Sequence, residues 1–346
     1  MTLGKSITCL LIAAGMLASG VAQEVRAQAN EKEIRWGTSR VGSSGHRTLT
    51  NLAQTLNKEV QGYEFTVQPT PGAIVSVKGY AIGDFEGYYG SDIAFYEFAN
   101  NIRRFEGFKD QMKREPVQSF WTFTLEMGVG IHSDNVGKIN SWGDLDGERV
   151  FTGPRPWDTR AALERAFEAL GIEHDYLEVD IKTAGSLLEQ GRFTGFGVYV
   201  NAETTPPPWL NEASLQTDWA LLSPSASELE RLESAGIAMV SVETSAFDKK
   251  KDYAKSAMML PFFYGLHLGM DVPEEDMYGI LRTVEANIDD IAASDKAFRQ
   301  IKEDMPRMQR RGVEASIDLV KVHPGLARYM REKGVWDAKW DSRIAR

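Results

Sequence analysis

Apolar positions along the chain alternate between two spacings, one typical of short strands and one typical of helices. Residues 34–38 are predicted to form a strand, and a helix follows whose apolar face is marked by Leu49, Leu52, Ala53 and Leu56. The same order of strand, polar loop and helix returns about 115 residues later, with a strand over 149–152 and a helix marked by Leu163, Ala166, Phe167 and Leu170. This pattern predicts an α/β protein with two similar lobes.

Two extended segments suggest where the chain passes between these lobes. Residues 123–131 are apolar and are predicted to carry the chain into the second lobe, and a strand near 237–242 is predicted to carry it back. The first lobe then comprises residues 30–130 and 241–346, and the second comprises residues 131–240. We expect a ligand cleft between the lobes.

Local patterns predict two further features of the chain. The segment 204–209 is proline-rich and is predicted to be stiff and non-helical. The C-terminal part is predicted to be largely helical, with one helix that starts at Pro273 and Glu274. Its apolar face comprises Met277, Ile280, Leu281, Val284, Ile288 and Ile291.

The N-terminus has the order of a secretory signal peptide. Lys5 supplies the positive charge, residues 7–18 are apolar, and Ala27 and Ala29 are small residues suited to a cleavage site. We therefore expect residues 1–29 to be removed, with 20–22 as a weaker alternative site, and the mature protein to reside in the periplasm. Cleavage would also remove Cys9, the single cysteine, so no disulfide or thiol chemistry is expected.

Composition and motifs exclude several classes of function. With 42% hydrophobic and 25% charged residues the chain has globular composition, and a net charge of −10 disfavours nucleic acid as a partner. The sequence has no G-x-S-x-G, H-E-x-x-H, Walker A or G-x-G-x-x-G motif. Its five histidines are spread singly, without the spacing of metal ligands. We expect a monomeric protein without catalytic residues, metal or cofactor.

The first candidate binding element is the Gly/Ser loop between the first strand and its helix. Small residues allow the backbone to approach a ligand closely, hydroxyl groups add donors, and the positive end of the helix favours a small anion such as a carboxylate. Arg40 and Arg47 are available to add positive charge. A flexible surface connection is the alternative interpretation. The predicted ligand-binding residues here are Thr38, Ser39, Ser43, Ser44, Gly45 and His46.

Two other loops offer similar chemistry. The second-lobe loop 153–160 contains Arg155, which is placed to clamp a carboxylate bidentately, together with Trp157 and Thr159. Arg160 is a reserve for this role, although an ion pair with Glu164 is an equal alternative. In the first lobe, the loop that begins at residue 70 supplies three more predicted ligand-binding residues, namely Gly72, Ala73 and Ser76.

Motifs in order along the whole mature chain resemble the TAXI-type solute receptors, the extracytoplasmic binding proteins of tripartite ATP-independent periplasmic (TRAP) transporters. The resemblance is carried by Gly37-Thr38 with Gly42-Ser43-Ser44-Gly45, Asp92-Ile93-Ala94-Phe95, residues 139–150 leading into Gly153-Pro154, residues 272–275 and residues 323–329. It implies a two-lobed type II periplasmic binding protein that delivers a small organic anion or amino acid, glutamate-like or dicarboxylate-like, to a TRAP-type membrane permease.

The sequence departs from the family pattern at His46, at Gly195 and in the proline-rich segment 204–209, which leaves the ligand's identity open. Three alternatives to the TRAP receptor also remain. These are a receptor for an ATP-driven importer of sulfonates or similar anions, a sensor subunit of the same fold, and an exported enzyme, which the missing catalytic motifs disfavour.

Overall fold

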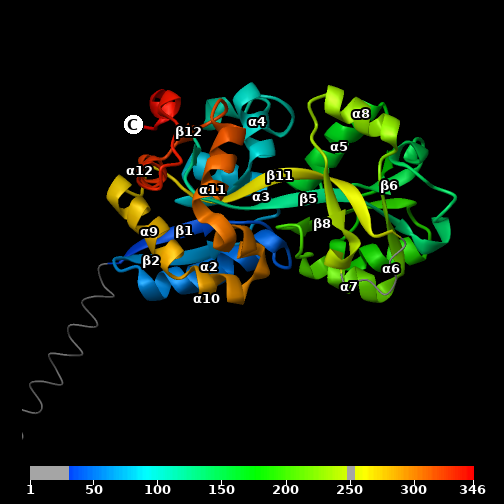
Figure 1. Ribbon diagram of the computed structural model, residues 1–346, viewed down its shortest axis with the longest axis horizontal. Coiled ribbons are helices and arrows are strands. Elements are labelled where there is room, and N and C mark those ends of the chain that lie inside the picture. Colours follow the sequence, from blue (N-terminus) through cyan, green and yellow to red (C-terminus); the bar gives the residue numbers. More distant parts are fainter. Residues whose placement is uncertain (1–30, 248–253) are drawn as a thin grey trace, which may run out of the picture.

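The computed structural model describes residues 31–247 and 254–346, so the predicted signal peptide, residues 1–29, lies outside the described residues. Two lobes, each with helices packed on its part of one continuous sheet, lie side by side and are joined by two long strands, β5 (Trp121–His132) and β11 (Ser256–Leu268) (Figure 1). The predicted α/β, two-lobed fold is therefore confirmed.

The first lobe is built on a mixed sheet with strand order β2-β1-β3-β11-β5. Strand β1 pairs in parallel with both β2 and β3, whereas β11 runs antiparallel to β3. The elements of this part are β1 (Lys32–Gly37), α2 (Ser44–Glu59), β2 (Tyr63–Gln68), α3 (Ala73–Ile82), β3 (Gly87–Ser91) and α4 (Asp92–Asn100). Helix α2 buries Leu49, Leu52, Ala53 and Leu56, the face predicted from their spacing.

The second lobe continues the same sheet as β11-β5-β8-β6-β7, with β9 paired to β5 and β10 paired to β11. Its strands are β6 (Arg149–Phe151), β7 (Asp175–Tyr176), β8 (Gly195–Asn201), β9 (Trp219–Leu222) and β10 (Val240–Glu243). Its helices are α5 (Asp158–Leu170), α6 (Ala184–Glu189), α7 (Pro208–Gln216) and α8 (Ala226–Ser234). Both lobes thus present strand-to-helix loops toward each other.

The C-terminal elements pack on the first lobe (Figure 1). They are α9 (Glu274–Ala286), α10 (Ile288–Ser294), α11 (Arg299–Ser316), which is kinked at Asp304, and α12 (Pro324–Glu332), together with a small sheet of β4 (Val117–Gln118) and β12 (Lys321–Val322). The helix predicted from Pro273 to beyond Ile288 is two helices, because Asn287 leaves helical geometry between them. Likewise, α7 begins inside the proline-rich segment, with Pro208 at its first position.

The chain returns to the first lobe later than predicted. Strand β10 pairs with residues 256–259 of β11, and Phe247 packs edge-on against Trp219 of the second lobe, with ring centroids 5.5 Å apart. The return therefore takes place within β11, which pairs with β10 at its start and with β3 at its end. Strand β5 makes the outward crossing over the segment predicted for it.

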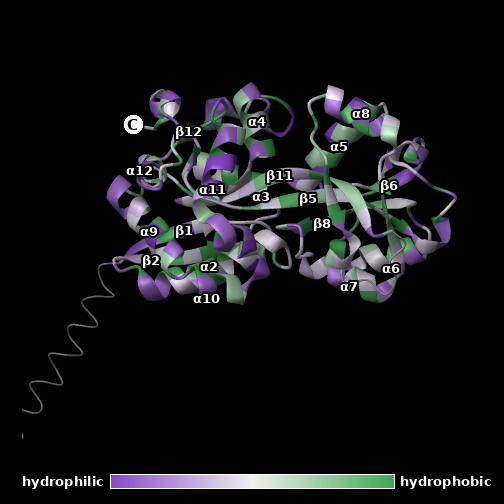
Figure 2. Ribbon diagram, in the orientation of Figure 1, coloured by the Kyte–Doolittle hydropathy of each residue, from purple (hydrophilic) through white to green (hydrophobic). Residues whose placement is uncertain are grey.

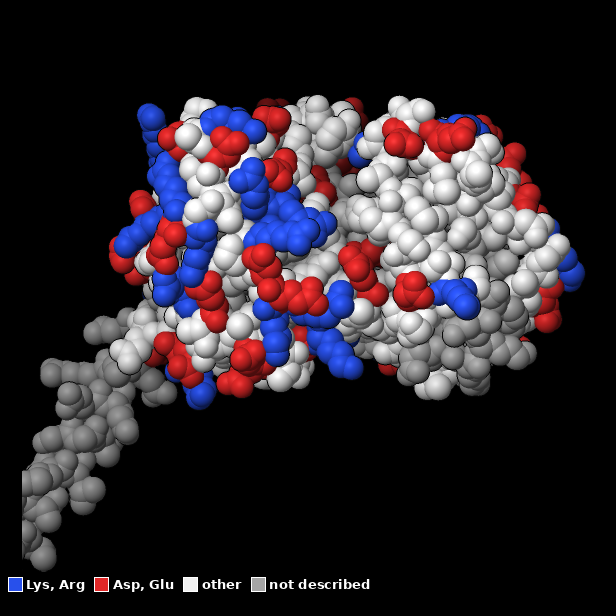
Figure 3. All heavy atoms as spheres, viewed as in Figure 1, with Lys and Arg blue, Asp and Glu red and all other residues white. Residues whose placement is uncertain are grey.

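The core is continuous through both lobes and is rich in aromatic residues. Trp36 and Trp121 are fully buried in the first lobe, and Trp142 and Trp219 in the second. Figure 2 shows hydrophobic residues along the central strands and on the inner sides of the helices, with polar residues on the outer sides. None of the described helices is long and apolar enough to cross a membrane. On the face in Figure 3, lysine and arginine side chains gather over the first lobe, around α11.

Candidate functional site

A small cavity lies between the two lobes, at the ends of the strand-to-helix loops. Its volume is about 20 Å³, which is room for about one water molecule, so the lobes are drawn together around it. The first-lobe loops contribute Ser39, Ser43, Ser44, Gly45 and Ala73 to its wall. Strands and the second lobe contribute Tyr89, Leu125, Trp157, Thr159, Tyr199 and Tyr264.

The hydroxyl groups in this wall come from the start of α2. Ser43 is the N-cap of the helix, and its Oγ accepts a hydrogen bond from the His46 N–H at 3.4 Å. The hydroxyl groups of Ser39 and Ser43 form a hydrogen bond with each other. Ser44 Oγ accepts a hydrogen bond from Asn201 Nδ2 of β8 at 2.6 Å, and the Ser44 hydroxyl also hydrogen-bonds the Tyr199 side chain.

Three helices begin at this cavity. Ser44 and Gly45 start α2, Ala73 starts α3, and Thr159 is the second residue of α5. The first N–H groups of an α-helix have no partner inside the helix, and the helix dipole adds partial positive charge there. Two of these N-termini belong to the first lobe and one to the second, so the cavity wall is suited to an anion when the lobes are closed.

The rest of the wall is aromatic and apolar. The rings of Tyr89 and Tyr264 are stacked, with centroids 4.2 Å apart and planes 8° apart, and Trp157 meets Tyr199 edge-on at 6.3 Å. The glycine at position 45 leaves room for the Tyr89 ring, because a Cβ at that position would lie 2.3 Å from it. Burial raises the pKa of Tyr199 to about 12, so this hydroxyl stays protonated.

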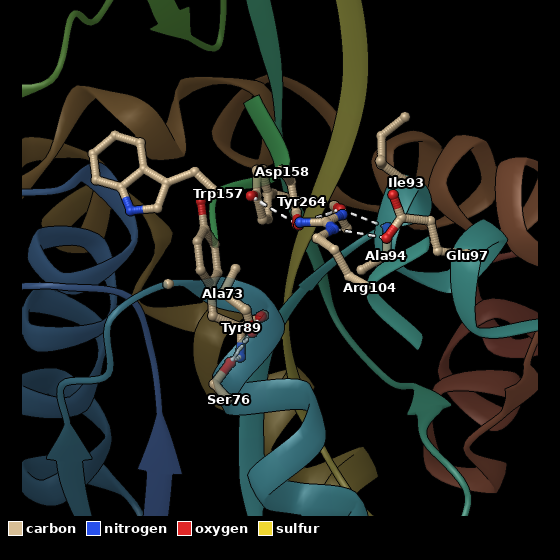
Figure 4. A network of polar contacts seen from close by, with 12 residues as sticks. Ala73, Ser76, Tyr89, Ile93, Ala94, Glu97, Arg104, Trp157, Asp158 and Tyr264 are labelled. Carbon is tan, nitrogen blue, oxygen red and sulfur yellow. Dashed lines mark hydrogen bonds and ion pairs between the residues drawn. The ribbon is translucent and has the colours of Figure 1, made fainter. Parts of the chain in front are cut away.

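A buried ionic network beside the cavity joins the lobes. The Asp158 side chain, at the first position of α5, is fully buried. Its Oδ1 accepts from Arg104 Nη1 at 2.6 Å, and its Oδ2 accepts from Ser91 Oγ at 2.6 Å and Tyr264 OH at 2.9 Å. Figure 4 shows the Arg104 guanidinium between Asp158 and Glu97, to which its Nε donates at 2.6 Å. The second lobe is thereby attached to first-lobe groups by a charge-assisted contact.

Other contacts across the cleft are close as well. Trp157 Nε1 donates to the Pro71 carbonyl at 3.2 Å, and the backbone of Gly72 faces that of Pro156. A Cβ on Gly72 would lie 2.6 Å from the Pro156 carbonyl oxygen. The lobes therefore meet with almost no free space at this point.

Of the predicted ligand-binding residues, seven line the cavity, namely Ser39, Ser43, Ser44, Gly45, Ala73, Trp157 and Thr159. Five do not. Thr38 is fully buried behind the loop, and its carbonyl accepts from Thr70 Oγ1 at 2.5 Å. His46 is half-buried in the first turn of α2, where burial lowers its pKa, and Gly72 lies at the contact with Pro156.

Ser76 and Arg155, which were also predicted to bind the ligand, do not line the cavity and have protein partners instead. Ser76 Oγ donates within α3 and toward the Tyr89 carbonyl, and it accepts from the Tyr89 N–H at 3.1 Å, so it joins the helix to β3. The Arg155 side chain is 71% exposed, and its Nε lies 3.4 Å from Glu178 Oε2. The prolines on either side of Arg155 do not turn its side chain toward the cavity.

The other arginines considered from the sequence have protein partners too. Arg160 lies 3.2 Å from Glu164, which is the ion-pair alternative, and stacks over Tyr176. Arg47 pairs with Asp295 at 2.9 Å, and one of its buried nitrogen atoms, Nη2, has no partner among the described residues. None of the residues that line the cavity in the described chain is an arginine or a lysine, so the positive potential of its wall comes from the helix N-termini.

Sequence reasoning missed Tyr264 and the Arg104–Asp158 contact. Asp158 is the first residue of α5, whose N-cap is Trp157, and its carboxylate points to the first lobe. Arg104 and Asp158 are 54 residues apart and no motif joins them, so no local signal was available. Tyr89 and Tyr199 do adjoin loop signals in the sequence, which is the one pattern that indicated them.

The histidines and the acidic side chains of the described residues were also candidates for a metal site. No group of three or more His, Cys, Asp or Glu side chains there is arranged to hold a metal ion. His267 and His323 are fully buried, and burial lowers the pKa of His267 to about 3 and that of His323 to about 4. Both are therefore neutral core residues at pH 7.

Comparisons with known proteins give one family. The sequence model of the NMT1-like family matches residues 48–334. The periplasmic aliphatic sulphonate binding protein SsuA from Escherichia coli has a TM-score of 0.43 at 13% identity, over 87% of this chain and 90% of its own. A putative L-cystine ABC transporter from Listeria monocytogenes has a TM-score of 0.42 at 13% identity, over 78% and 95%. A Bordetella bronchiseptica protein has a TM-score of 0.45 at 12% identity, over 90% and 92%. No curated protein matches the sequence.

Proposed function

The chain belongs to the NMT1-like family, and from this premise we propose that it is a periplasmic solute-binding protein that closes its two lobes on a small organic anion. The observation that carries the proposal is the meeting of three helix N-termini, from both lobes, at one cavity with serine and threonine hydroxyls. Such a wall offers N–H and O–H donors to a carboxylate without a buried cation.

Closure supplies the affinity in this scheme. Thr159 of α5 belongs to the second lobe, whereas Ser44 and Gly45 of α2 belong to the first, so a carboxylate contacts all three only when the lobes are together. A ligand that binds one conformation better than another shifts the population toward it. Because the cavity holds about one water molecule, an organic acid enters the open form and widens the site as the lobes close on it.

The resemblance to TAXI receptors supports delivery to a TRAP-type membrane permease, after export through a cleaved signal peptide. A receptor for an ATP-driven importer has the same requirements at the cleft and is the alternative partner assignment. Co-purification of the mature protein with membranes that contain either the permease or the importer encoded beside its gene separates the two.

A thermal-shift screen tests the binding proposal. A ligand that binds the folded form alone raises the melting temperature according to RT ln(1 + [L]/Kd), so about 2.7 kcal/mol is gained at a hundredfold excess over Kd. We expect at least one small organic acid to stabilise the protein, and uncharged analogues such as the matching amides to be without effect. If acids and amides shift the melting temperature equally, the anion site does not exist.

A further inference from the structure

The chemistry of the cavity wall narrows the class of ligand. We infer that the ligand is a monocarboxylate with an apolar body and no ammonium group. This inference rests on the proposed function, and it differs from the glutamate-like or dicarboxylate-like ligand that the family resemblance implies. It comes from the aromatic and apolar side chains that share the cavity wall with the helix N-termini, and from the partners that the nearby charged side chains already have.

An apolar body fits the wall beyond the hydroxyl groups. Tyr89 and Tyr264 form a stacked pair, Leu125 lies on the crossing strand β5, and Trp157 and Tyr199 meet at an edge. Burying apolar ligand surface against such rings is favourable, by roughly 25 cal/mol per Å². The carboxylate is then held at the N-termini of α2 and α5, and the hydrocarbon part lies against the aromatic side chains.

An ammonium group finds no counter-charge in the cavity. No aspartate or glutamate is among the residues that line it within the described chain. The nearest carboxylate in the sequence, Asp158, already accepts from Arg104, Ser91 and Tyr264. A buried ammonium without a carboxylate partner loses its hydration with too little in return, which selects against amino acids.

A second carboxylate on the ligand would find no positively charged side chain in the cavity to pair with. No lysine or arginine is among the lining residues of the described chain, and Arg155 is exposed on the outer side. Arg104 is held between Asp158 and Glu97. Arg47 is paired with Asp295 through its Nε, and although its Nη2 has no partner among the described residues, Arg47 is not one of the residues that line the cavity. A dicarboxylate would therefore place one of its two charges against tyrosine rings or Leu125, which is costly.

Three matched pairs of compounds test this choice by calorimetric titration of the mature protein. Leucine and 4-methylpentanoate differ in one ammonium group, as do phenylalanine and 3-phenylpropionate, and glutarate differs from pentanoate in one carboxylate. We expect 4-methylpentanoate or 3-phenylpropionate to bind at least about tenfold more tightly than its amino acid, and pentanoate to bind more tightly than glutarate by a similar factor, because a charge buried without a partner is rejected strongly.

The outcomes separate the inference from the proposed function. If leucine, phenylalanine or glutarate binds as tightly as its matched monocarboxylate, the inference is wrong and the solute-binding proposal stands. If none of the acids binds, at any concentration up to 10 mM (roughly the limit of useful affinity), the proposed function itself fails.

Ser39 offers a second test within the same cavity. Ser39→Asp introduces a carboxylate into the wall, so the preference should move at least about tenfold toward leucine over 4-methylpentanoate. Ser39→Asn, which has a similar shape and no charge, should keep the preference for the monocarboxylate. An unchanged ratio in folded Ser39→Asp protein would show that the cavity does not set the selectivity, and the inference would be abandoned.

Discussion

At the scale of single residues, the sequence identified side chains with the right chemistry better than it identified their directions. Ser43, Ser44 and Thr159, which were predicted to bind a ligand, line the cavity, because they lie where a strand-to-helix loop meets its helix and local pattern gives the position of such loops. Arg155 lies in such a loop too, but its side chain pairs with Glu178 outside the cleft. Which way a long side chain turns depends on neighbours distant in sequence, and no local pattern contains them.

Buried carboxylates were not foreseen at all, and Glu126 on β5 is an example with a measurable consequence. Its side chain is 1% exposed, its Oε2 accepts from the Glu203 N–H at 2.8 Å, and burial raises its pKa to about 7. The unfolded carboxyl group titrates near 4.3. Between these values the folded state binds more protons than the unfolded state, so this residue lowers stability as pH rises from about 4 to about 7.

Glu126→Gln removes this cost and keeps an oxygen acceptor for the Glu203 N–H. We expect the free energy of unfolding at pH 8 to increase by roughly 1–3 kcal/mol, with little change at pH 4, where both residues are neutral. Urea unfolding of the parent and the variant at the two pH values measures this difference. An equal effect at both values would mean that the charge of Glu126 is not responsible.

At the scale of elements, the N-termini of α2, α3 and α5 are the features that make the cavity suited to an anion. The apolar spacing predicted α2 and α5, and α5 ends at Gly171, which has a left-handed conformation with φ +62°. The meeting of three helix N-termini was beyond the reach of the pattern, because it depends on how the lobes are placed. The same is true of Gly72, which was predicted as a ligand-binding residue and lies at the closest backbone contact between the lobes.

Gly72→Ala tests that contact. The backbone at Gly72 is extended, with φ −176°, so alanine fits the isolated first lobe without strain. Its Cβ would lie 2.6 Å from the Pro156 carbonyl oxygen, so the closed form must shift. We expect about tenfold weaker ligand binding, equivalent to ~1.4 kcal/mol, while the far-UV circular dichroism spectrum of the variant matches that of the parent.

Gly279→Ala is the matched control, because a Cβ there meets nothing within 4 Å and the residue lies inside α9. It should bind ligand like the parent and be slightly more stable, since alanine is the better helix former. Equal affinities for the Gly72 and Gly279 variants would argue that the lobes do not close as tightly in the complex.

At the scale of the whole molecule, the sequence predicted two α/β lobes and the outward crossing in β5, and it misplaced the return. The strand near residue 240 was expected to be the return, but it pairs at the second-lobe end of β11, and β11 itself makes the crossing. Hydropathy gives the presence of a strand, whereas strand order depends on pairing over long distances. The ionic contact between the lobes at Asp158 likewise joins residues far apart in the sequence, so hydropathy could not predict it.

Asp158→Asn tests whether that contact holds the lobes together. The change removes the charge that faces Arg104 and keeps the size of the side chain, and breaking a buried ion pair costs about 3–5 kcal/mol. We expect small-angle X-ray scattering of the ligand-free variant to give a larger radius of gyration than the parent.

Glu168→Gln is its control, because the Arg103–Glu168 ion pair also joins the lobes. The side chains of Arg103 and Glu168 are 42% and 68% exposed, and exposed ion pairs contribute little to stability. This variant should keep the radius of gyration of the parent. A compact Asp158→Asn protein would mean that closure rests on other contacts, such as Trp157 with Pro71.

The central claim is that donors at the start of α2 hold the ligand's carboxylate, and calorimetric titration of Ser44→Ala against Asn201→Ala tests it most directly. Both changes remove the hydrogen bond between Ser44 Oγ and Asn201, and Ser44→Ala alone removes the hydroxyl donor. We predict that Ser44→Ala weakens binding of the acid found by screening by about 1–3 kcal/mol, which is the usual cost of leaving a charged acceptor short of a partner. Asn201→Ala should lose much less. Equal affinity of Ser44→Ala and the parent, or an equal loss in the two variants, would contradict the account.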